Sequence, residues 1–282
     1  MSIEKTGKLN RLQRDLPEGL LASAAWLVAK GYSPQLCNKY VASGWLERLA
    51  QGVYKRPGGK LVWEQVVISL QALLEFPLVV GGKTALTLQG FAHYLPREVN
   101  DVHLYGPKAM PTWLNKLPLQ VRFHYHNSET LFRDDPITRG LTHLSWIQKE
   151  NTSVSADPVH GRFNIMPWGQ WDWPLTLSTP ERAILELLDD LPEHESFDQA
   201  DKFMEGLASL SPRRIQKLLA DCKSVKVKRL FLFFAARHHH GWLKHLDTAA
   251  VNLGTGKRML ARGGKLDQRY LITVPEELHG TK

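Results

Sequence analysis

The sequence predicts an α+β fold in which a small helix-and-hairpin module precedes a larger mixed α/β domain. Helix-period and strand-like segments are mixed along the chain rather than regularly alternating, which disfavours a doubly wound sheet. The first 58 residues contain three short helical segments and two strand-like runs. A length of 282 residues fits two or three domains. We expect one domain over residues 1–58 and a second over 59–282, with a possible subdivision near residue 175.

The N-terminal segment predicts two helices with a short strand between them. Residues 5–15 carry leucines at helical spacing, and Pro17 ends this helix. Residues 20–21 can form a short strand. Ser23 can cap a second helix, which Gly31 ends immediately before a third.

The third helix begins with a Ser-Pro pair and ends at a glycine. The Ser33 hydroxyl can cap the first turn, Pro34 suits the first helical position, and Gly44 can adopt the left-handed conformation that ends a helix. At about 100° per residue, the side chains separate into two faces. The apolar face consists of Leu36, Cys37, Tyr40 and Val41. The polar face consists of Gln35, Asn38, Lys39, Ala42 and Ser43.

Two short strand-like runs follow the third helix, over residues 45–49 and 53–56. Gly52 supplies the positive φ angle that the short loop between them requires. The order helix, helix, tight glycine turn, helix and hairpin is that of a winged helix-turn-helix, whose wing would point toward Lys55 and Arg56. A small three-helix protein-interaction domain with the same core is the alternative, and the charge of the chain argues against it.

Charge is distributed unevenly along the chain, whose formal net charge is +8. Residues 1–60 hold ten Lys or Arg against four Asp or Glu, residues 61–212 hold 11 against 19, and residues 213–282 hold 15 against five. Both ends are therefore basic, and the middle is acidic. Basic ends that present helices favour polyanionic partners, and a protein that contacts several phosphates loses affinity steeply as salt rises.

These features predict that the module binds double-stranded DNA. Gln35, Asn38 and Lys39 would face base edges in the major groove, because amides can bond adenine in a bidentate manner. Lys55 and Arg56 would hold phosphates or enter the minor groove. The predicted DNA-binding residues are Lys8, Arg11, Ser33, Gln35, Asn38, Lys39, Ser43, Lys55 and Arg56.

The cysteine and hydropathy patterns disfavour several classes of protein. Cys37 and Cys222 lack the CxxC spacing of a zinc site and do not indicate a disulfide framework. No apolar run approaches the roughly 20 residues that a membrane helix needs, and the N-terminus lacks the apolar stretch of a signal peptide. We expect a cytoplasmic protein with no cofactor and no membrane partner.

The middle of the chain predicts a mixture of helices and strands. Helices are expected over residues 63–76 and after Gly81, and Pro77 ends the first of them. The expected strands cover residues 78–80, 101–105, 120–126 and 141–148.

One motif in this region invites comparison with nucleotidyltransferases, in which a glycine turn opens a helix and an Asp-x-Asp pair on the next strand holds metal. The chain has Gly81-Gly82, a helix and then Asp101-x-His103. His103 replaces one carboxylate, although two-metal phosphoryl transfer requires clustered oxygen ligands. We therefore interpret the motif as structural. A phosphoryl or nucleotidyl transferase that uses residues 81–84 and Asp101 is the alternative.

Three histidines in the predicted strands form a second pattern. His103, His124 and His126 could meet on one face of a sheet as a zinc trio. Solvated strand histidines are the simpler interpretation, so we predict no metal site.

The last third of the chain predicts a helical part followed by a C-terminal β-hairpin. Ser178 or Thr179 would cap a helix that begins at Pro180, and further helices are expected over residues 197–210, 212–222 and 225–237. The basic residues that could form a second polyanion-facing surface are Arg213, Arg214, Lys217, Lys226, Lys228, Arg229, Lys257 and Arg258. Internal pairing with the acidic segment 61–212 is the alternative use of these charges.

Several blocks of this sequence together resemble one protein family. They are KLNRLQRDLPEGLLASAAWLVAKGYSPQLCNKYVASGWLERLAQGVYKRPG, VGGKTALTLQGFAHYLP, STPERAILELLDDLP, and LGTGKR with GGKLDQRYLITVP. These blocks are similar to the AbiEi antitoxins of abortive-infection type IV toxin–antitoxin systems. The similarity runs from residue 5 to about residue 278, and its first and last blocks are the most specific.

The resemblance implies a winged helix that represses its own operon, and a C-terminal domain that counteracts a partner nucleotidyltransferase toxin in phage defence without a stable complex. It supplies no catalytic motif, so we expect no enzyme activity. The second basic surface would then carry antitoxicity, by engaging RNA or an acidic face of the toxin. An RNA-binding protein that shields the substrate of the toxin is a further alternative.

Overall fold

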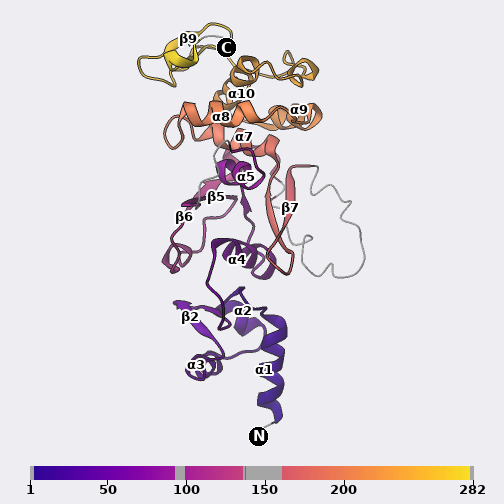
Figure 1. Cartoon of the computed structure of the whole chain (residues 1–282), viewed down its shortest axis with the longest axis vertical. Coiled ribbons are helices and arrows are strands. Elements are labelled where there is room, and N and C mark those ends of the chain that lie inside the picture. The colour runs from indigo at the N-terminus through magenta and orange to yellow at the C-terminus, as the bar shows by residue number, and fades with distance from the viewer. Residues whose placement is uncertain (1–2, 93–98, 136, 138–160, 280–282) are drawn as a thin grey trace.

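The computed structural model describes residues 3–92, 99–135, 137 and 161–279, and it has the predicted mixture of helices and sheets (Figure 1). The strand predicted over residues 141–148 lies outside the described residues. The chain extends along one axis, with the N-terminal helices at one end and the C-terminal strands at the other (Figure 1). In the described part, no helix combines the length and the apolar character that crossing a membrane requires.

The N-terminal module contains three helices and a three-stranded antiparallel sheet of order β1-β3-β2. Its elements are α1 (Ile3–Asp15), β1 (Leu21–Ser23), α2 (Ala24–Ala29), α3 (Pro34–Ala42), β2 (Glu47–Ala50) and β3 (Val53–Lys55). The predicted short strand is present, and its last residue, Ser23, also caps α2 by accepting a hydrogen bond from the Trp26 N–H at 3.1 Å. The hairpin begins at Glu47 rather than at residue 45.

This module packs directly on the larger domain. The helix predicted over residues 63–76 is divided into α4 (Trp63–Ile68) and a π-helix, η1 (Ser69–Leu73). The Leu21 N–H donates to Ser69 Oγ at 2.8 Å in the buried contact between β1 and η1. One large cluster of buried hydrophobic residues contains members from Leu12 to Leu278, and so from both parts of the chain. The parts on either side of the boundary expected at residue 58 therefore share a core.

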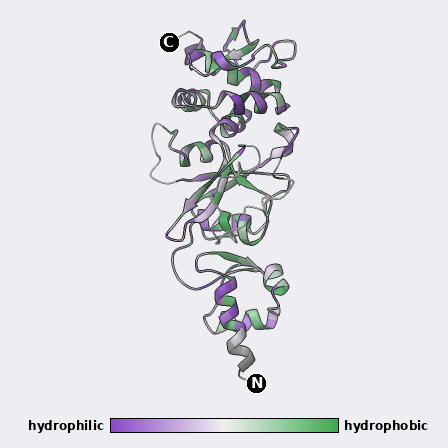
Figure 2. Cartoon of the chain, turned by 90° about the vertical axis from the view of Figure 1, so that its right-hand side faces the viewer, coloured by the Kyte–Doolittle hydropathy of each residue, from purple (hydrophilic) through white to green (hydrophobic). Residues whose placement is uncertain are grey.

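A five-stranded mixed sheet of order β6-β5-β4-β8-β7 forms the centre of the molecule. Its strands are β4 (Val79–Val80), β5 (Asp101–Gly106), β6 (Arg122–Asn127), β7 (Phe163–Trp168) and β8 (Trp173–Ser178). The pairs β5–β6 and β4–β8 are parallel, whereas β4–β5 and β7–β8 are antiparallel. Figure 2 shows hydrophobic residues concentrated along this sheet. The possible subdivision near residue 175 falls within β8, whose pairing with β4 joins segments on both sides of it.

Helix α7 lies at the centre of the helical layer, where it contacts α5, α8, α9, α10 and β8. The described helices of the larger domain beyond η1 are α5 (Gly82–Leu88), α6 (Ser128–Leu131), α7 (Pro180–Asp189), α8 (Phe197–Gly206), α9 (Pro212–Asp221) and α10 (Val225–Arg237), with short segments η2 (Leu114–Lys116), η5 (Leu243–His245) and η6 (Glu276–Leu278). β9 (Lys265–Asp267) and β10 (Ile272–Val274) pair antiparallel, which confirms the C-terminal hairpin.

The start of α7 differs from the capping that the sequence predicts. Thr179 occupies the N-cap position, but its hydroxyl donates to the Arg162 backbone O at 3.3 Å. Ser178 Oγ donates instead to Glu186 Oε1 at 3.0 Å. Both hydroxyls therefore connect elements of the tertiary structure rather than cap the helix.

The buried Glu186 carboxylate connects α7 to the sheet and to α5. It accepts hydrogen bonds from Arg182 Nε at 2.7 Å, Ser178 Oγ at 3.0 Å and the Gly82 N–H at 2.9 Å. Arg182 Nη1 also lies 3.3 Å from Asp135 Oδ1. Burial raises the pKa of Glu186, and the charge of Arg182 opposes that shift. A buried pair of this kind is costly to break, because either charge alone is left uncompensated.

We predict that Glu186→Ala lowers the free energy of unfolding by about 3–5 kcal/mol, because it removes one partner of a buried ion pair. Asp198→Ala is the matched control, since Asp198 and Lys202 also form an i,i+4 pair but are exposed. Its effect should stay within about 1 kcal/mol. Urea denaturation of both variants measures the difference, and equal losses would contradict the structural role of Glu186.

Candidate nucleic-acid interface

Helix α3 presents the polar face that the sequence predicts. Ser33 Oγ accepts a hydrogen bond from the Leu36 N–H at 3.2 Å, and Gly44, with φ 70°, follows the end of the helix. Cys37 and Tyr40 are buried in the core. The exposed residues of the opposite face are Gln35, Asn38, Lys39, Ala42 and Ser43.

Two of the predicted contacts on α3 have partners within the helix. The Ser33 hydroxyl serves as the cap, and Ser43 Oγ donates to the Lys39 backbone O at 2.8 Å. The longer side chains of Gln35, Asn38 and Lys39 are exposed on the helix surface. The geometry therefore assigns Ser33 and Ser43 to the helix ends, while the longer polar side chains remain exposed.

Arg48, which was not among the residues predicted from the sequence, joins this face. Its Nη2 donates to Asn38 Oδ1 at 3.0 Å and to the Tyr54 hydroxyl at 3.3 Å, and its guanidinium lies 5.6 Å from the centroid of the Tyr54 ring. The side chain thus connects α3 to the hairpin and places a positive charge beside Asn38. In the hairpin, Arg48 lies opposite Tyr54, and this pairing is the only feature of the sequence that could have indicated its role. Its contact with Asn38 depends on how the hairpin folds back on α3.

Lys55 and Arg56 do not lie at the tip of the hairpin, contrary to the prediction. The turn is at Gly52, with φ 73°, whereas Lys55 is the last residue of β3, the central strand of the sheet. The Lys55 side chain is only 6% exposed, and its Nζ pairs with Glu47 Oε2 at 2.8 Å and donates to the Gly58 backbone O at 2.8 Å. Lys55 therefore holds the chain as it leaves the module, and its burial does not agree with a phosphate contact.

The remaining predicted contacts lie on other parts of the module. Arg56 Nη1 donates to the Gln13 backbone O at 3.2 Å, which ties the end of the hairpin to α1. Lys8 and Arg11 are exposed on α1, and Arg11 Nε lies 3.3 Å from Asp15 Oδ2. These side chains belong to elements separate from the polar face of α3.

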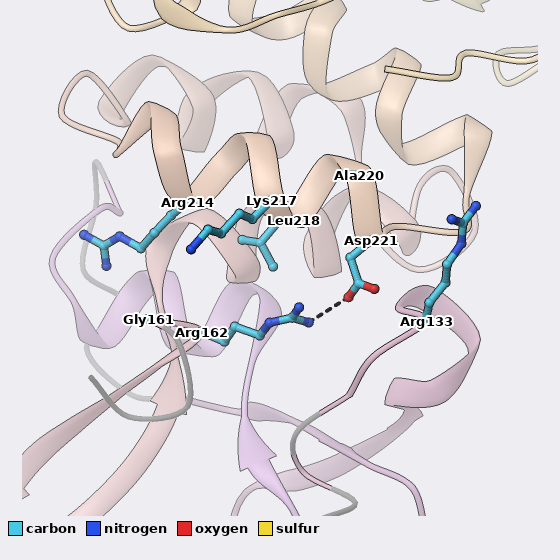
Figure 3. A pocket seen from close by; sticks show the side chains of 8 residues that line it. All are labelled: Arg133, Gly161, Arg162, Arg214, Lys217, Leu218, Ala220 and Asp221. Atoms are coloured by element: carbon cyan, nitrogen blue, oxygen red, sulfur yellow. Dashed lines mark hydrogen bonds and ion pairs between the residues drawn. The ribbon is translucent and has the colours of Figure 1, made fainter. Parts of the chain in front are cut away.

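A second basic site lies beside α9 in the larger domain (Figure 3). This basic pocket has a volume of about 420 Å³. It is lined by Arg133, Gly161, Arg162, Arg214, Lys217, Leu218, Ala220 and Asp221. Figure 3 shows Arg214, Lys217 and Asp221 on α9, with Arg162 below them and Arg133 to one side. Four cationic side chains and one carboxylate give its wall an excess of positive charge.

The four cations of the basic pocket differ in how they are held. Arg162 Nη1 donates to Asp221 Oδ2 at 2.7 Å. Arg214 Nε lies 3.4 Å from Glu181 Oε1, and Glu181 is buried. Arg133 and Lys217 are exposed. The pocket thus combines two guanidinium groups that pair with carboxylates, of which that of Arg214 is still 42% exposed, with two further exposed side chains.

The structure corrects the assignment of Lys226, Lys228 and Arg229 to a surface. Lys228 and Arg229 are buried, and they donate to the backbone O of Asn252 at 3.3 Å and of Gly256 at 2.7 Å. Burial lowers the pKa of Arg229. Lys226 Nζ is partly buried and lies 3.7 Å from an Asp189 carboxylate oxygen. These cations hold the C-terminal segment and the end of α7 instead of facing a partner.

The remaining residues of the predicted surface are exposed but are not all brought together. Arg213, Lys257 and Arg258 are exposed and are not among the residues that line the basic pocket. The pairs Arg214–Glu181 and Lys226–Asp189 join the basic C-terminal segment to the acidic middle. The internal pairing that the sequence left open therefore accounts for part of the charge.

The Gly81-Gly82 turn is closed by the protein itself. A Cβ at Gly81 would lie 2.3 Å from Tyr105 Cδ2, so no larger residue fits there. The Gly82 N–H at the start of α5 donates to Glu186. The chain's own carboxylate thus occupies the place where a nucleotide phosphate would bind at this turn.

The histidines of β5 and β6 do not form the zinc-binding trio that the sequence offered as an alternative. His103 Nδ1 lies 3.0 Å from His126 Nε2 and 3.8 Å from Asp190 Oδ2. His124 is exposed and pairs with Asp101 at 2.7 Å, and this hydrogen bond lowers the pKa of Asp101. Asp190, which follows α7, was missed because it lies far along the chain from both strands.

These histidines also differ from the solvated side chains that the sequence predicts. His103 is buried, and the side chain of His126 is 19% exposed. Burial lowers the pKa of His103 to about 3 and that of His126 to about 4. Burial also raises the pKa of Asp190 to about 7. The interpretation as solvated histidines is therefore wrong for His103 and His126.

Comparisons with known proteins identify the family of the chain. A family model described as "Transcriptional regulator, AbiEi antitoxin, Type IV TA system" matches residues 99–275. A second, described as "Transcriptional regulator, AbiEi antitoxin N-terminal domain", matches residues 5–97. The matches define the chain as a transcriptional regulator of the antitoxin class. It belongs to the AbiEi family of type IV toxin–antitoxin systems.

Similarity to a solved structure concerns the fold. The crystal structure of the RV2827C protein from Mycobacterium tuberculosis aligns with a TM-score of 0.54 and 14% sequence identity, covering 94% of this chain and 88% of that chain. At this identity the likeness concerns the fold alone. No curated protein matches the chain.

Because Lys55 is buried, we predict that its substitution affects the stability of the fold rather than a direct contact with DNA. Lys55→Ala should lower the free energy of unfolding by about 1–3 kcal/mol, because the Gly58 carbonyl and Glu47 lose their donor. Lys60→Ala, at an exposed lysine nearby, should change it by less than about 0.5 kcal/mol. Thermal denaturation and gel shifts measure both effects. Unchanged stability with weakened DNA binding would restore Lys55 as a phosphate contact.

Proposed function

We propose that this AbiEi-family regulator binds operator DNA through an N-terminal winged helix-turn-helix, represses its own operon, and counteracts a nucleotidyltransferase toxin through its C-terminal domain. The observation that carries the DNA-binding part is the order α1-β1-α2-α3-β2-β3, with the sheet order β1-β3-β2. A helix-turn-helix presents its second helix to the major groove, and α3 holds that position here. Its outer face is polar and exposed.

In this proposal, Gln35, Asn38 and Lys39 read base edges. Asparagine and glutamine amides bond adenine in a bidentate manner, and lysine favours guanine. Arg48 donates to one lone pair of Asn38 Oδ1, which orients the amide and leaves the second lone pair and the NH₂ group for a base. Arg48 also brings a positive charge to the edge of the face, where a phosphate would lie.

The other proposed contacts act on the phosphate backbone. Lys8 and Arg11 lie on α1, and Arg56 lies after the hairpin that forms the wing. Phosphate contacts position a protein on the duplex without reading its sequence. Ser33 and Ser43 support the ends of α3, and Lys55 is excluded from the interface by its burial.

The antitoxin part of the proposal rests on the basic pocket. A cavity of about 420 Å³ with four cationic side chains offers charge-assisted hydrogen bonds to a phosphate group. Arg162 and Arg214 pair with carboxylates of the chain, whereas Arg133 and Lys217 are exposed to an incoming anion. We favour RNA as the ligand, because a concave pocket with cations on its wall suits a phosphate group better than a flat acidic protein face does. A stable complex with the toxin is then not required.

The geometry argues against the transferase alternative. The Gly82 N–H donates a hydrogen bond to the Glu186 carboxylate, so a nucleotide phosphate at this turn would have to displace a buried carboxylate. Asp101 pairs with His124 and has no second carboxylate on its strand. We therefore propose a regulator rather than an enzyme, acting in the cytoplasm where its operon is transcribed.

We predict that Asn38→Ala weakens binding to the operator by about 1–3 kcal/mol and has little effect on random DNA, because the lost contact is to a base. Asn10→Ala, at an exposed asparagine of α1, is the matched control and should bind both DNAs as the parent does. Gel-shift titrations with the protein's own upstream DNA and a scrambled duplex measure both. Equal losses on the two DNAs would remove Asn38 from base reading.

We also predict that the Arg133→Glu, Lys217→Glu double variant fails to rescue cells from the toxin while operator binding and thermal stability persist. Replacing these two exposed cations by glutamate reverses the charge of the basic pocket and leaves the Arg162–Asp221 and Arg214–Glu181 pairs intact. Cell survival on toxin expression measures rescue.

Lys257→Glu, Arg258→Glu is the control, since it makes the same change of charge outside the basic pocket and should keep rescue. If the pocket variant still rescues, or if both variants fail equally, the pocket is not the site of antitoxicity. Binding of a short RNA by the parent, lost only in the pocket variant, would distinguish RNA from an acidic face of the toxin.

A further inference from the structure

We propose that His103, His126 and Asp190 form a site for one divalent transition-metal ion, and that Zn²⁺ is the ion it fits best. Each residue offers one ligand atom, and these atoms all lie within 4.8 Å of one another. Over the described residues, this is the only group of three or more His, Cys, Asp or Glu side chains that meets this distance. The inference is independent of the DNA-binding and antitoxin functions proposed above.

The separations of the ligand atoms agree with a tetrahedral ion. Metal–ligand distances of about 2.0–2.2 Å place two ligand atoms of a tetrahedral Zn²⁺ about 3.3–3.5 Å apart. His103 Nδ1 lies 3.0 Å from His126 Nε2 and 3.8 Å from Asp190 Oδ2. These two separations lie on either side of the expected value, and the ligand atoms of the remaining pair lie within 4.8 Å of each other. Side-chain rotations that bring this remaining pair closer together would complete the site.

Rigid elements hold the three ligands. In the parallel register of β5 and β6, His126 pairs with Tyr105, two residues beyond His103, so His103 and His126 are diagonal neighbours on one face of the sheet. The Tyr105 ring stacks on His126 with a centroid distance of 4.5 Å. Asp190 directly follows α7, which the buried Arg182–Glu186 pair fixes. Ligands on such elements are positioned before an ion arrives.

Asp190 faces both imidazoles of the cluster. Its Oδ2 lies 3.8 Å from His103 Nδ1, and its Oδ1 lies 3.4 Å from His126 Nδ1. His103 and Asp190 are buried, and the side chain of His126 is 19% exposed. A divalent ion held between the three side chains would balance the charge of a carboxylate that burial separates from water.

The donor set determines the class of ion. Two imidazoles and one carboxylate suit Zn²⁺ and related transition metals, whereas Mg²⁺ prefers oxygen ligands. The replacement of a carboxylate by His103 therefore disfavours the magnesium chemistry of nucleotidyltransferases and favours a zinc-type site. Such an ion would join the β5–β6 edge of the sheet to the end of α7. Its binding would stabilise the folded state by mass action.

The test uses the full chain without a histidine tag, stripped with a chelator. Calorimetric titration with ZnCl₂ should give one ion per chain, and CoCl₂ should give the visible absorption of a tetrahedral site. ZnCl₂ should raise Tm, and MgCl₂ at the same concentration should not.

His126→Ala and Asp190→Asn should weaken Zn²⁺ binding by more than the roughly 10–100-fold that loss of an outer partner costs. Asp190→Asn keeps the shape of the side chain, and circular dichroism verifies its fold. His124→Ala is the matched control, because His124 lies on the same face of the sheet but outside the cluster, and it should bind Zn²⁺ as the parent does. The proposal is overturned if the parent does not bind Zn²⁺, if His126→Ala and Asp190→Asn bind it with the parent's affinity, or if MgCl₂ raises Tm equally.

Discussion

The arrangement of the larger domain depends on one buried carboxylate, that of Glu186. Its three hydrogen-bond donors come from different places: Arg182 on α7 itself, Ser178 at the end of β8, and Gly82 at the start of α5. A buried charge is tolerated only when such partners surround it, so the three elements must stay in register with one another. The Gly-Gly turn follows from the same constraint, because a Cβ at Gly81 would lie 2.4 Å from Glu186 Oε2. A motif that resembles a nucleotide site is here part of the packing.

The basic residues of the chain serve two physical purposes. Arg182, Lys228 and Arg229 are buried and donate to groups of the same chain, which stabilises the fold. Arg133 and Lys217 are exposed beside a cavity, where an anion can reach them. Net charge alone does not separate these uses, because burial and pairing decide whether a cation faces a partner. The excess of charge at the C-terminal end is therefore only partly available for binding.

The two proposed binding sites lie on different parts of an elongated molecule. Helix α3 is near one end, and α9, which carries much of the basic pocket, is in the helical layer beyond the sheet (Figure 1). The two parts are nevertheless not independent, since their hydrophobic residues form one core and β1 contacts η1. This layout allows DNA and a second polyanion to be contacted by separate surfaces of one folded unit.

The sequence by itself determined the local structure. Ser33 caps the start of α3, Gly44 follows its end, Gly52 lies in the hairpin turn, and Pro180 is the first residue of α7. The sequence predicts these features because capping, φ angles and helical period depend on a few neighbouring residues. The tertiary structure decided which polar side chains are available. Lys55 was predicted to face DNA and is buried, and Asp190 meets His103 and His126 only because α7 ends above the β5–β6 edge. Burial and pairing arise between elements far apart in the chain, and periodicity and local motifs do not encode those contacts.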